Sequence, residues 1–175
     1  DAKVTLELWT KLLVANLKGV KAVDVIIFNG DDELRNAVNN QLVDIIYISS
    51  LQYLQNKDHL NIVPIVKTNI NKKDFYDIMI CSYKESNISD FNSMRNKKIL
   101  VQGGKYKKIN DLWLNLLCLQ NGISDRNKFF KKVEFTEKPI RAVLPVFLKK
   151  TDLCLVNSGS LEILSEMNPQ VPKSL

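Results

Sequence analysis

The sequence predicts an α/β fold made of two lobes. Two short apolar runs rich in β-branched residues, 23–28 and 43–48, are each followed by a polar turn and then by a helical pattern. The same alternation returns from residue 98 onward, after a polar and charged stretch at 84–97. Strands that alternate with helices indicate parallel sheets, and the polar stretch marks a boundary between two of them.

The chain opens with a predicted amphipathic helix over residues 3–17. Its apolar side chains recur at three- and four-residue steps and share one face: Leu6, Trp9, Leu13 and Leu17. The run 23–28 is a predicted strand, and the turn 29–32 leads from it into a second helix that an aspartate caps.

The second strand-to-helix step begins at the run 43–48. Ser49 and Ser50 follow it in cap position before a third helix. Two further apolar runs, 62–66 and 76–81, are predicted to form a hairpin or two neighbouring strands.

The second half repeats the pattern with a predicted strand over 98–102 and a turn over 103–105. The helix that follows ends near Gly122, and its apolar face consists of Ile109, Leu112, Trp113, Leu116 and Leu119. A strand over 129–135 and a helix over 140–147 come next.

Pro145 lies inside that helix, and it is expected to kink or shorten it because proline lacks the backbone donor. A last strand over 152–156 and a short helix through Leu164 complete the predicted second lobe.

The positive charge of the chain is concentrated in its middle. The formal net charge is +6, and residues 84–150 hold fifteen lysine and arginine residues against six acidic ones. This pattern favours an anionic ligand, an acidic partner or an anionic membrane surface, and a lysine-rich solvated face remains the alternative. Nucleic acid is not expected as a partner, because the basic residues are not interleaved with exposed aromatic residues or arranged in a nucleic-acid-binding motif.

The cysteine and histidine content argues against a metal site and against catalysis by a nucleophile. Cys81, Cys118 and Cys154 each lie in an apolar run, so they are predicted to be unpaired and mostly buried. His59 is the one histidine and follows a lysine and an aspartate in a polar turn. No metal ligand set, no cofactor motif and no catalytic residue is therefore predicted.

Candidate ligand contacts lie where the predicted strands end. In an open α/β sheet, the turns at the carboxyl ends of the strands line the ligand crevice. Small, hydroxylated and glycine residues fill five such turns: 29–31, 49–50, 103–106, 136–138 and 157–159. The turn of Gly103, Gly104 and Lys105 fits an anion cradle, but it lacks the spacing of a nucleotide-binding P-loop.

Several segments resemble one family of ligand-binding proteins. The segment 44–54, Asp-Ile-Ile-Tyr-Ile-Ser-Ser-Leu-Gln-Tyr-Leu, and the segment 28–34 before it resemble PhnD-like phosphate, phosphite and phosphonate ABC transporter substrate-binding proteins. The segments 142–147, 151–156 and 166–171 resemble the second-lobe ending of the same family. The resemblance covers nearly the whole chain.

The resemblance implies a type 2 periplasmic-binding fold, with two lobes that close on a small ligand. Residues 1–84 would form the first lobe, 85–165 the second, and 166–175 the start of a return to the first. The first β-strand and the C-terminal return strand of that fold are not present, so a truncated or sensor-type member is expected. The implied location is the periplasm or another extracytoplasmic space, free or membrane-anchored in a longer protein.

The resemblance also implies the site. Tyr47 and Ser49, with Ser50 beside them, fall on first-lobe contact positions. The second-lobe positions are Gly103, Gly104, Lys105 and Tyr106 in the gripping turn, Lys138, and Asn157 with Ser158 after the last strand. The family's gripping turn usually carries serine and threonine residues, and a histidine often stands where this chain has Lys138 and Pro139. These differences suggest that Lys105 or Lys138 binds an anion in this chain.

The leading hypothesis is therefore binding without chemistry. The partners would be a small anionic ligand and either an ABC permease or the membrane-bound signalling protein to which the domain belongs. The alternatives are an enzyme, such as a synthase or transferase, on a similar two-lobed fold, and a purely structural or partner-binding module.

Overall fold

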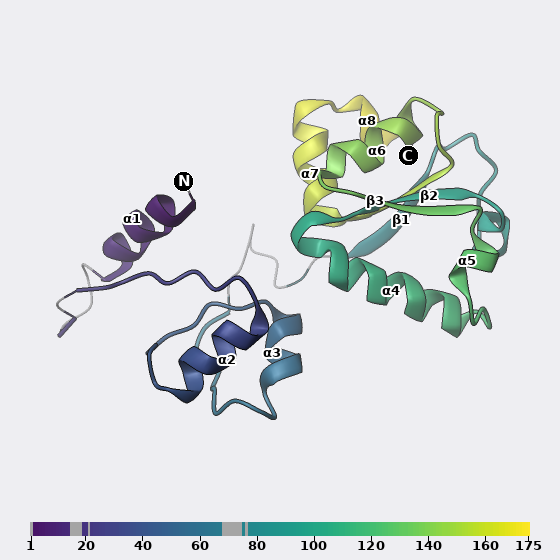
Figure 1. The fold of residues 1–175 in the computed structure, drawn as a ribbon. Coiled ribbons are helices and arrows are strands. Elements are labelled where there is room, and N and C mark those ends of the chain that lie inside the picture. The colour runs from purple at the N-terminus through teal and green to yellow at the C-terminus, as the bar shows by residue number, and fades with distance from the viewer. Residues whose placement is uncertain (1, 15–18, 21, 68–74, 76) are drawn as a thin grey trace. The chain divides into compact units, whose positions relative to one another are not determined.

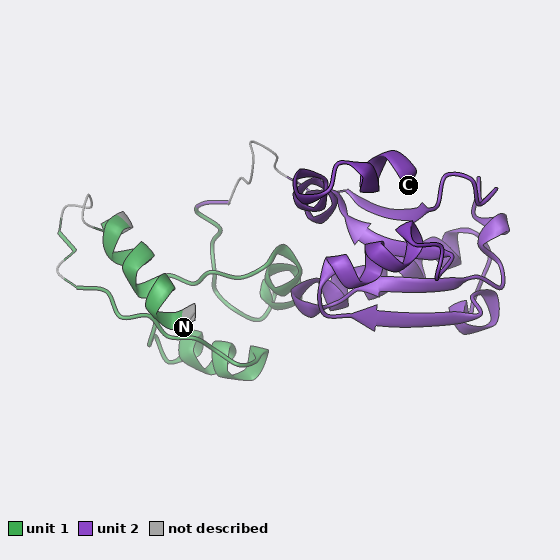
Figure 2. Cartoon of the chain, turned by 90° about the horizontal axis from the view of Figure 1, so that it is seen from above, with its two compact units in different colours: residues 1–65 green, residues 66–175 purple. Residues whose placement is uncertain are grey.

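The computed structural model describes residues 2–14, 19–20, 22–67, 75 and 77–175. The chain forms two compact units, residues 1–65 and residues 66–175, which are coloured separately in Figure 2. The expected boundary at residues 84 and 85 differs from this division, because the segment around residue 80 belongs to the sheet of unit 2.

Unit 1 contains the helices α1 (Ala2–Val14), α2 (Asp31–Asn39) and α3 (Ser50–Asn56) among its described residues (Figure 1). The predicted first helix is confirmed as α1, although Leu17 lies outside the described residues. The second helix has no aspartate cap. Its N-cap is Gly30, and the Glu33 carboxylate instead accepts a 2.9 Å hydrogen bond from the Asn29 backbone N–H.

The predicted strands of unit 1 are not formed. Residues 23–28, 43–48 and 62–66 carry no ladder hydrogen bonds, and their apolar side chains include Ile45, which is 75% exposed, and Val63, which is 77% exposed. An apolar run becomes a strand only when a neighbouring strand pairs with it and another layer covers it. The run 62–66 forms no strand, so it makes neither the expected hairpin nor the expected pair of neighbouring strands with 76–81, whereas Ile78–Ser82 does form a strand, in unit 2.

Unit 2 is built on a mixed four-stranded sheet. Its strands are β1 (Ile78–Ser82), β2 (Lys98–Gln102), β3 (Lys132–Thr136) and β4 (Leu153–Asn157), in the spatial order β1-β4-β2-β3. β2 runs parallel to both β3 and β4, whereas β1 runs antiparallel to β4. The carboxyl ends of three strands and the beginning of β1 therefore lie along one edge, which we call the C-terminal edge.

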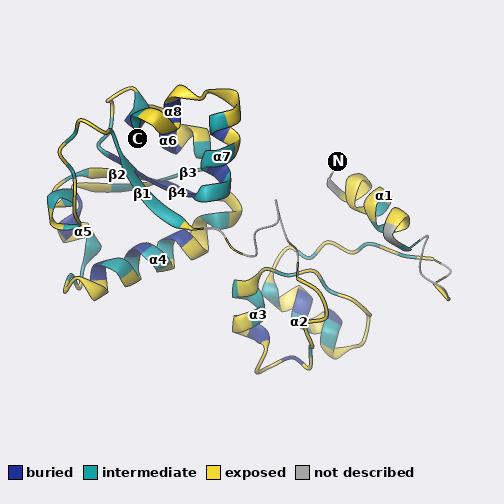
Figure 3. Ribbon diagram, turned by 180° about the vertical axis from the view of Figure 1, so that it is seen from behind, coloured by how far each residue is buried: buried dark blue, intermediate teal, exposed yellow. Residues whose placement is uncertain are grey.

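Helices cover both faces of this sheet (Figures 1 and 3). One face packs against α4 (Lys107–Gln120), and its core contains Leu114 and Leu155. The other face packs against α6 (Pro139–Phe147), α7 (Ser158–Met167) and α8 (Gln170–Ser174). All five residues of β4 are buried, because alternate side chains enter opposite cores.

Short elements complete unit 2. They are two single-turn 3₁₀ helices, η1 (Asn92–Met94) and η2 (Gly104–Tyr106), and the short helix α5 (Arg126–Phe129). Phe129 thus ends a helix instead of beginning the strand predicted at 129–135, and its ring stacks on Phe91 at 4.6 Å between centroids. Pro145 lies inside α6, which ends at Phe147.

The last ten residues belong to unit 2. Val171 is 1% exposed in the core beneath α6 and α7, and the Ser174 carbonyl oxygen accepts a 2.8 Å hydrogen bond from the Lys84 backbone N–H. Residues 166–175 therefore pack on the second lobe, whereas we expected them to begin a crossover to the first. Among the described residues, no helix is both long enough and apolar enough to cross a membrane.

Candidate functional site

The C-terminal edge of the unit 2 sheet brings together predicted site residues from three turns. Gln102, the last residue of β2, connects them. It is 2% exposed, its side-chain amide nitrogen donates to the Ser160 hydroxyl at 2.8 Å, and its side-chain oxygen accepts from the Asn157 backbone N–H at 3.1 Å. Its backbone oxygen accepts from the Asn110 side chain at 2.7 Å. These bonds fix the ends of β2 and β4 and the beginnings of α4 and α7 in one frame.

Asn157 ends β4 and caps α7. Its side-chain oxygen accepts a 2.8 Å hydrogen bond from the Ser160 backbone N–H. Asn157 is 3% exposed, and its side-chain nitrogen has no hydrogen-bond partner among the described residues. A buried donor without a partner costs about 1–3 kcal/mol, so such groups mark places where a ligand or a water oxygen completes the site.

Ser158 holds the beginning of β1 at the same edge. Its backbone N–H donates to the Asp77 carbonyl oxygen at 2.8 Å, and its hydroxyl accepts from the Asp77 backbone N–H at 3.2 Å. The antiparallel strand β1 is thereby fixed beside the turn that carries Asn157.

The backbone of the turn after β2 is in close contact with the backbone of the turn after β3. The Gly103 N–H donates to the Thr136 carbonyl oxygen at 2.7 Å, and a Cβ atom at Gly103 would lie 2.8 Å from that oxygen. Gly104 has φ +56°, and its Cβ would lie 3.1 Å from the Glu137 carbonyl oxygen. Only glycine fits both positions without displacing the neighbouring backbone. The predicted glycine turn is therefore a close contact between two loops.

Lysine side chains flank this glycine contact. The Lys105 ammonium lies 5.1 Å from the centroid of the Tyr106 ring, and the Lys107 ammonium lies 5.5 Å from the centroid of the Phe135 ring. An open depression of about 380 Å³ lies beside the turn and is lined by Gly104, Lys105, Lys107, Lys108 and Asp111. Three lysine side chains and one carboxylate, that of Asp111, therefore line the surface beside the turn.

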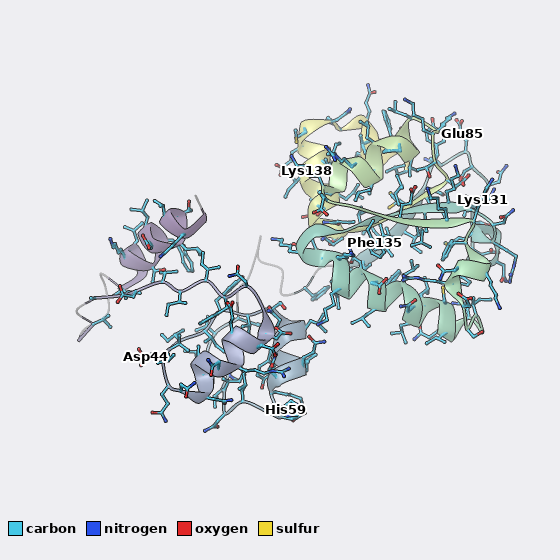
Figure 4. All side chains as sticks on the ribbon, viewed as in Figure 1. Asp44, His59, Glu85, Lys131, Phe135 and Lys138 are labelled. Atoms are coloured by element: carbon cyan, nitrogen blue, oxygen red, sulfur yellow. The ribbon has the colours of Figure 1, made fainter. Side chains whose placement is uncertain are left out.

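Lys138 comes from the neighbouring turn. It is exposed at the N-cap of α6, and its carbonyl oxygen accepts a 3.2 Å hydrogen bond from the Thr136 hydroxyl. In Figure 4, Lys138 lies at one end of the sheet of unit 2, and Glu85 and Lys131 lie at the other. Lys138 therefore shares the C-terminal edge with the glycine turn.

Unit 1 holds the three remaining predicted site residues. Tyr47 is 81% exposed. Ser49 caps α3 as predicted: its hydroxyl oxygen accepts a 3.2 Å hydrogen bond from the Gln52 backbone N–H, and the Gln52 side chain accepts in return from the Ser49 backbone N–H at 3.1 Å. Ser50 is the exposed first residue of α3. Ser49 therefore has a structural role independent of any ligand.

Three polar residues of the C-terminal edge were not predicted from the sequence: Gln102, Asn110 and Ser160. Each is a buried polar residue within or beside an apolar run. A buried polar side chain has to be hydrogen-bonded, so an isolated glutamine at the end of an apolar strand was the available signal.

Neither His59 nor a group of acidic residues offers a metal site in the described part of the chain. His59 is exposed in the turn after α3 and labelled in unit 1 in Figure 4. No cluster of three or more histidine, cysteine, aspartate or glutamate residues that could hold a metal ion occurs among residues 2–14, 19–20, 22–67, 75 and 77–175.

Comparison with solved structures identifies the fold. Over 99% of its length, the chain is similar to a binding protein component of an ABC phosphonate transporter from Pseudomonas aeruginosa, with a TM-score of 0.57 and 16% identity. It is also similar over 97% of its length to an ancestral arginine-binding protein bound to arginine, with a TM-score of 0.48 and 16% identity. The chain covers 59% and 65% of the lengths of these two proteins. The first similarity confirms the predicted α/β type 2 periplasmic-binding fold, which is present in part.

Comparison of sequences identifies the family. No curated protein matches the chain significantly. The profile of the family described as "ABC transporter, phosphonate, periplasmic substrate-binding protein" matches residues 3–175. This chain therefore belongs to the family of periplasmic substrate-binding proteins of phosphonate ABC transporters.

Proposed function

We propose that this chain binds a small anionic ligand of the phosphate or phosphonate type and works as an extracytoplasmic solute-binding domain. It would close on the ligand and either deliver it to an ABC permease or report it through a membrane-bound signalling protein. Membership of a family of periplasmic substrate-binding proteins supports this proposal, and so does the chemistry of the C-terminal edge of unit 2.

The contact of Gly104 with Glu137 is the observation that carries the proposal. A Cβ atom at Gly104 would lie only 3.1 Å from the Glu137 carbonyl oxygen, so the turn after β2 packs directly on the turn after β3, and this contact brings together the two turns that carry Lys105 and Lys138. Backbone N–H groups at the start of a helix lack partners within the helix and bind oxyanions. Lys105 in that turn and Lys138 in the neighbouring turn add positive charge to the C-terminal edge.

The charge of the edge is not uniformly positive. The Glu137 carboxylate oxygen would lie 3.9 Å from a Cβ atom at Gly104. This carboxylate opposes binding of a highly charged anion and is compatible with an anion that also carries a positive group. Ligands of both kinds therefore belong in the test.

Isothermal titration calorimetry tests the proposal. The ligands are phosphate, methylphosphonate, 2-aminoethylphosphonate and acetate, with L-arginine as a comparison of different charge. We expect at least one of the phosphorus oxyanions to bind. A charge-assisted hydrogen bond contributes about 1.5–3 kcal/mol, so Lys105→Ala or Lys138→Ala should weaken that binding roughly ten- to a hundredfold.

Lys128→Ala is the matched control, because Lys128 is an exposed lysine in α5, away from the C-terminal edge. It should leave the affinity unchanged. Equal affinity in the wild type, Lys105→Ala and Lys138→Ala proteins would remove both lysines from the site. Conversion of a bound ligand into a product would favour the enzyme alternative over a binding protein.

A further inference from the structure

Two cysteines stand directly opposite each other in the sheet of unit 2. Cys81 of β1 is paired with Cys154 of the antiparallel strand β4. Continued by one residue beyond the ladder, this register places Asp77 opposite Ser158, whose backbone N–H donates a 2.8 Å hydrogen bond to the Asp77 carbonyl oxygen. Because hydrogen-bonded pairs recur at every second position of an antiparallel ladder, Cys81 and Cys154 also form such a pair.

The backbone spacing of such a pair suits a disulfide. Opposite residues in a hydrogen-bonded pair have Cα atoms about 5.5 Å apart. Disulfides span Cα separations of about 4.4–6.8 Å. Opposite residues in a ladder also project to the same face of the sheet. Both cysteine side chains accordingly belong to the core beneath α6 and α7.

The third cysteine cannot compete for either partner. Cys118 lies on α4 and is buried in the core on the opposite face of the sheet. The sheet itself therefore separates Cys118 from the other two thiols. The three thiols are mostly buried, as expected: Cys118 and Cys154 are buried, and Cys81 is half-buried.

The two thiols already interact in the reduced protein. A hydrogen bond from the Cys154 thiol lowers the pKa of Cys81, although partial burial raises it. The same hydrogen bond and burial raise the pKa of Cys154 well above its ordinary value. Cys81, the less buried of the two thiols, is therefore the member that forms a thiolate more readily, and Cys154 is the buried member that holds its proton more tightly.

We infer that Cys81 and Cys154 form a redox-active pair that closes into a cross-strand disulfide by exchange with a small disulfide oxidant. The Cys81 thiolate attacks one sulfur of the oxidant, which gives a mixed disulfide and releases one thiol. The Cys154 sulfur then loses its proton, attacks the Cys81 sulfur and releases the second thiol. The oxidant thus gains two electrons and two protons, and the protein gains one S–S bond.

The bond should be readily reversible. Opposite Cβ atoms in a ladder lie about 4.5–5.5 Å apart, whereas a disulfide holds its Cβ atoms at about 3.8 Å. Closing the bond therefore pulls β1 toward β4 and strains the ladder, and strained disulfides are the more easily reduced ones. The family of this chain is periplasmic, and oxidising compartments favour disulfide formation.

The experiment uses the full chain in its native state. The protein is incubated with glutathione disulfide, quenched with acid, unfolded, and treated with N-ethylmaleimide before mass spectrometry. We expect one alkylated cysteine, Cys118, and a linked pair of peptides that contain Cys81 and Cys154. Incubation of the native oxidised protein with reduced glutathione should return three alkylated cysteines.

Three alkylated cysteines after oxidation would overturn the inference, and so would a stable glutathione adduct on Cys81 or a linkage to Cys118. Two variants provide controls. Cys118→Ala should still form the bond, and Cys81→Ser should leave both remaining thiols open to alkylation. A bond that reduced glutathione opens only after the chain is unfolded would contradict the reversible character of the pair.

Discussion

The Gly103 backbone N–H donates a 2.7 Å hydrogen bond to the carbonyl oxygen of Thr136, which joins the turn after β2 to the end of β3. This bond leaves no room for a side chain, because a Cβ atom at Gly103 would lie 2.8 Å from the same oxygen. The two turns of the candidate site can therefore pack this closely only because residue 103 has no Cβ atom.

Gly103→Ala should therefore destabilise unit 2 and weaken ligand binding together. The collision involves backbone on both sides, and such overpacking typically costs about 1–3 kcal/mol. Gly122→Ala is the control: Gly122 has φ +75° and nothing within 4 Å of its Cβ position, so it tests backbone strain without a collision. It should lower stability in urea by about 1–2 kcal/mol and leave ligand affinity unchanged. Equal ligand affinity in both variants would contradict the role of Gly103.

Gln102→Leu should destabilise unit 2, because it removes the partners of two buried polar groups. The Ser160 hydroxyl and the Asn157 backbone N–H would each lose a hydrogen bond to Gln102. Each orphaned group costs about 1–3 kcal/mol. Gln120→Leu changes an exposed glutamine at the end of α4 and should alter stability by less than about 0.5 kcal/mol. Similar urea midpoints for the two variants would show that Gln102 is not a structural centre of the edge.

Ser49→Ala should shorten or loosen α3, because it removes the capping box formed with Gln52. The loss of a serine cap costs about 0.5–2 kcal/mol. Ser50→Ala, at the exposed first helical position, should have almost no effect on stability. Amide hydrogen exchange in α3 measures the difference. If the amides of α3 exchange as slowly in both variants as in the wild type, the capping box contributes nothing measurable to the stability of α3.

The alkylation rate of Cys81 should depend on pH differently from that of Cys118. The hydrogen bond from Cys154 lowers the pKa of Cys81, which populates its thiolate at a lower pH than in an ordinary thiol. Burial raises the pKa of Cys118, although the nearby Arg126 partly offsets this. In the native reduced protein, iodoacetamide should therefore modify Cys81 first, and the rate for Cys81 should begin to rise at a lower pH than the rate for Cys118. Faster modification of Cys118 at every pH would contradict the assignment.

Local patterns predicted the second half of the chain well. Residues 98–102 form β2 as expected, because an apolar run with buried alternate residues becomes a strand where neighbours pair with it on both sides. The same type of run at 43–48 forms no strand. The two runs differ in whether neighbouring strands pair with them, and the local sequence of a run does not show whether such strands exist.

The positions of the candidate site residues in the fold were predicted in part, whereas their role in ligand binding stays a prediction. Gly103, Asn157 and Ser158 share one edge because parallel strands end together, which the strand–turn–helix pattern implies. The network around Gln102 depends on hydrogen bonds between residues 58 positions apart, such as Gln102 with Ser160, and these require the fold itself. The pairing of Cys81 with Cys154 likewise depends on strand register, which spacing along the chain does not give.

Chemical-shift mapping by NMR of the ¹⁵N-labelled chain tests the central claim most directly. During titration with methylphosphonate and with phosphate, the amide resonances of Gly103 and Gly104 and the side-chain NH₂ resonance of Asn157 should shift in a saturable manner. Resonances of residues 126–131, at the opposite end of the sheet, should stay in place. Saturable shifts confined to that opposite end, or no shift with either oxyanion, would contradict the proposal that the C-terminal edge of unit 2 binds a small anion.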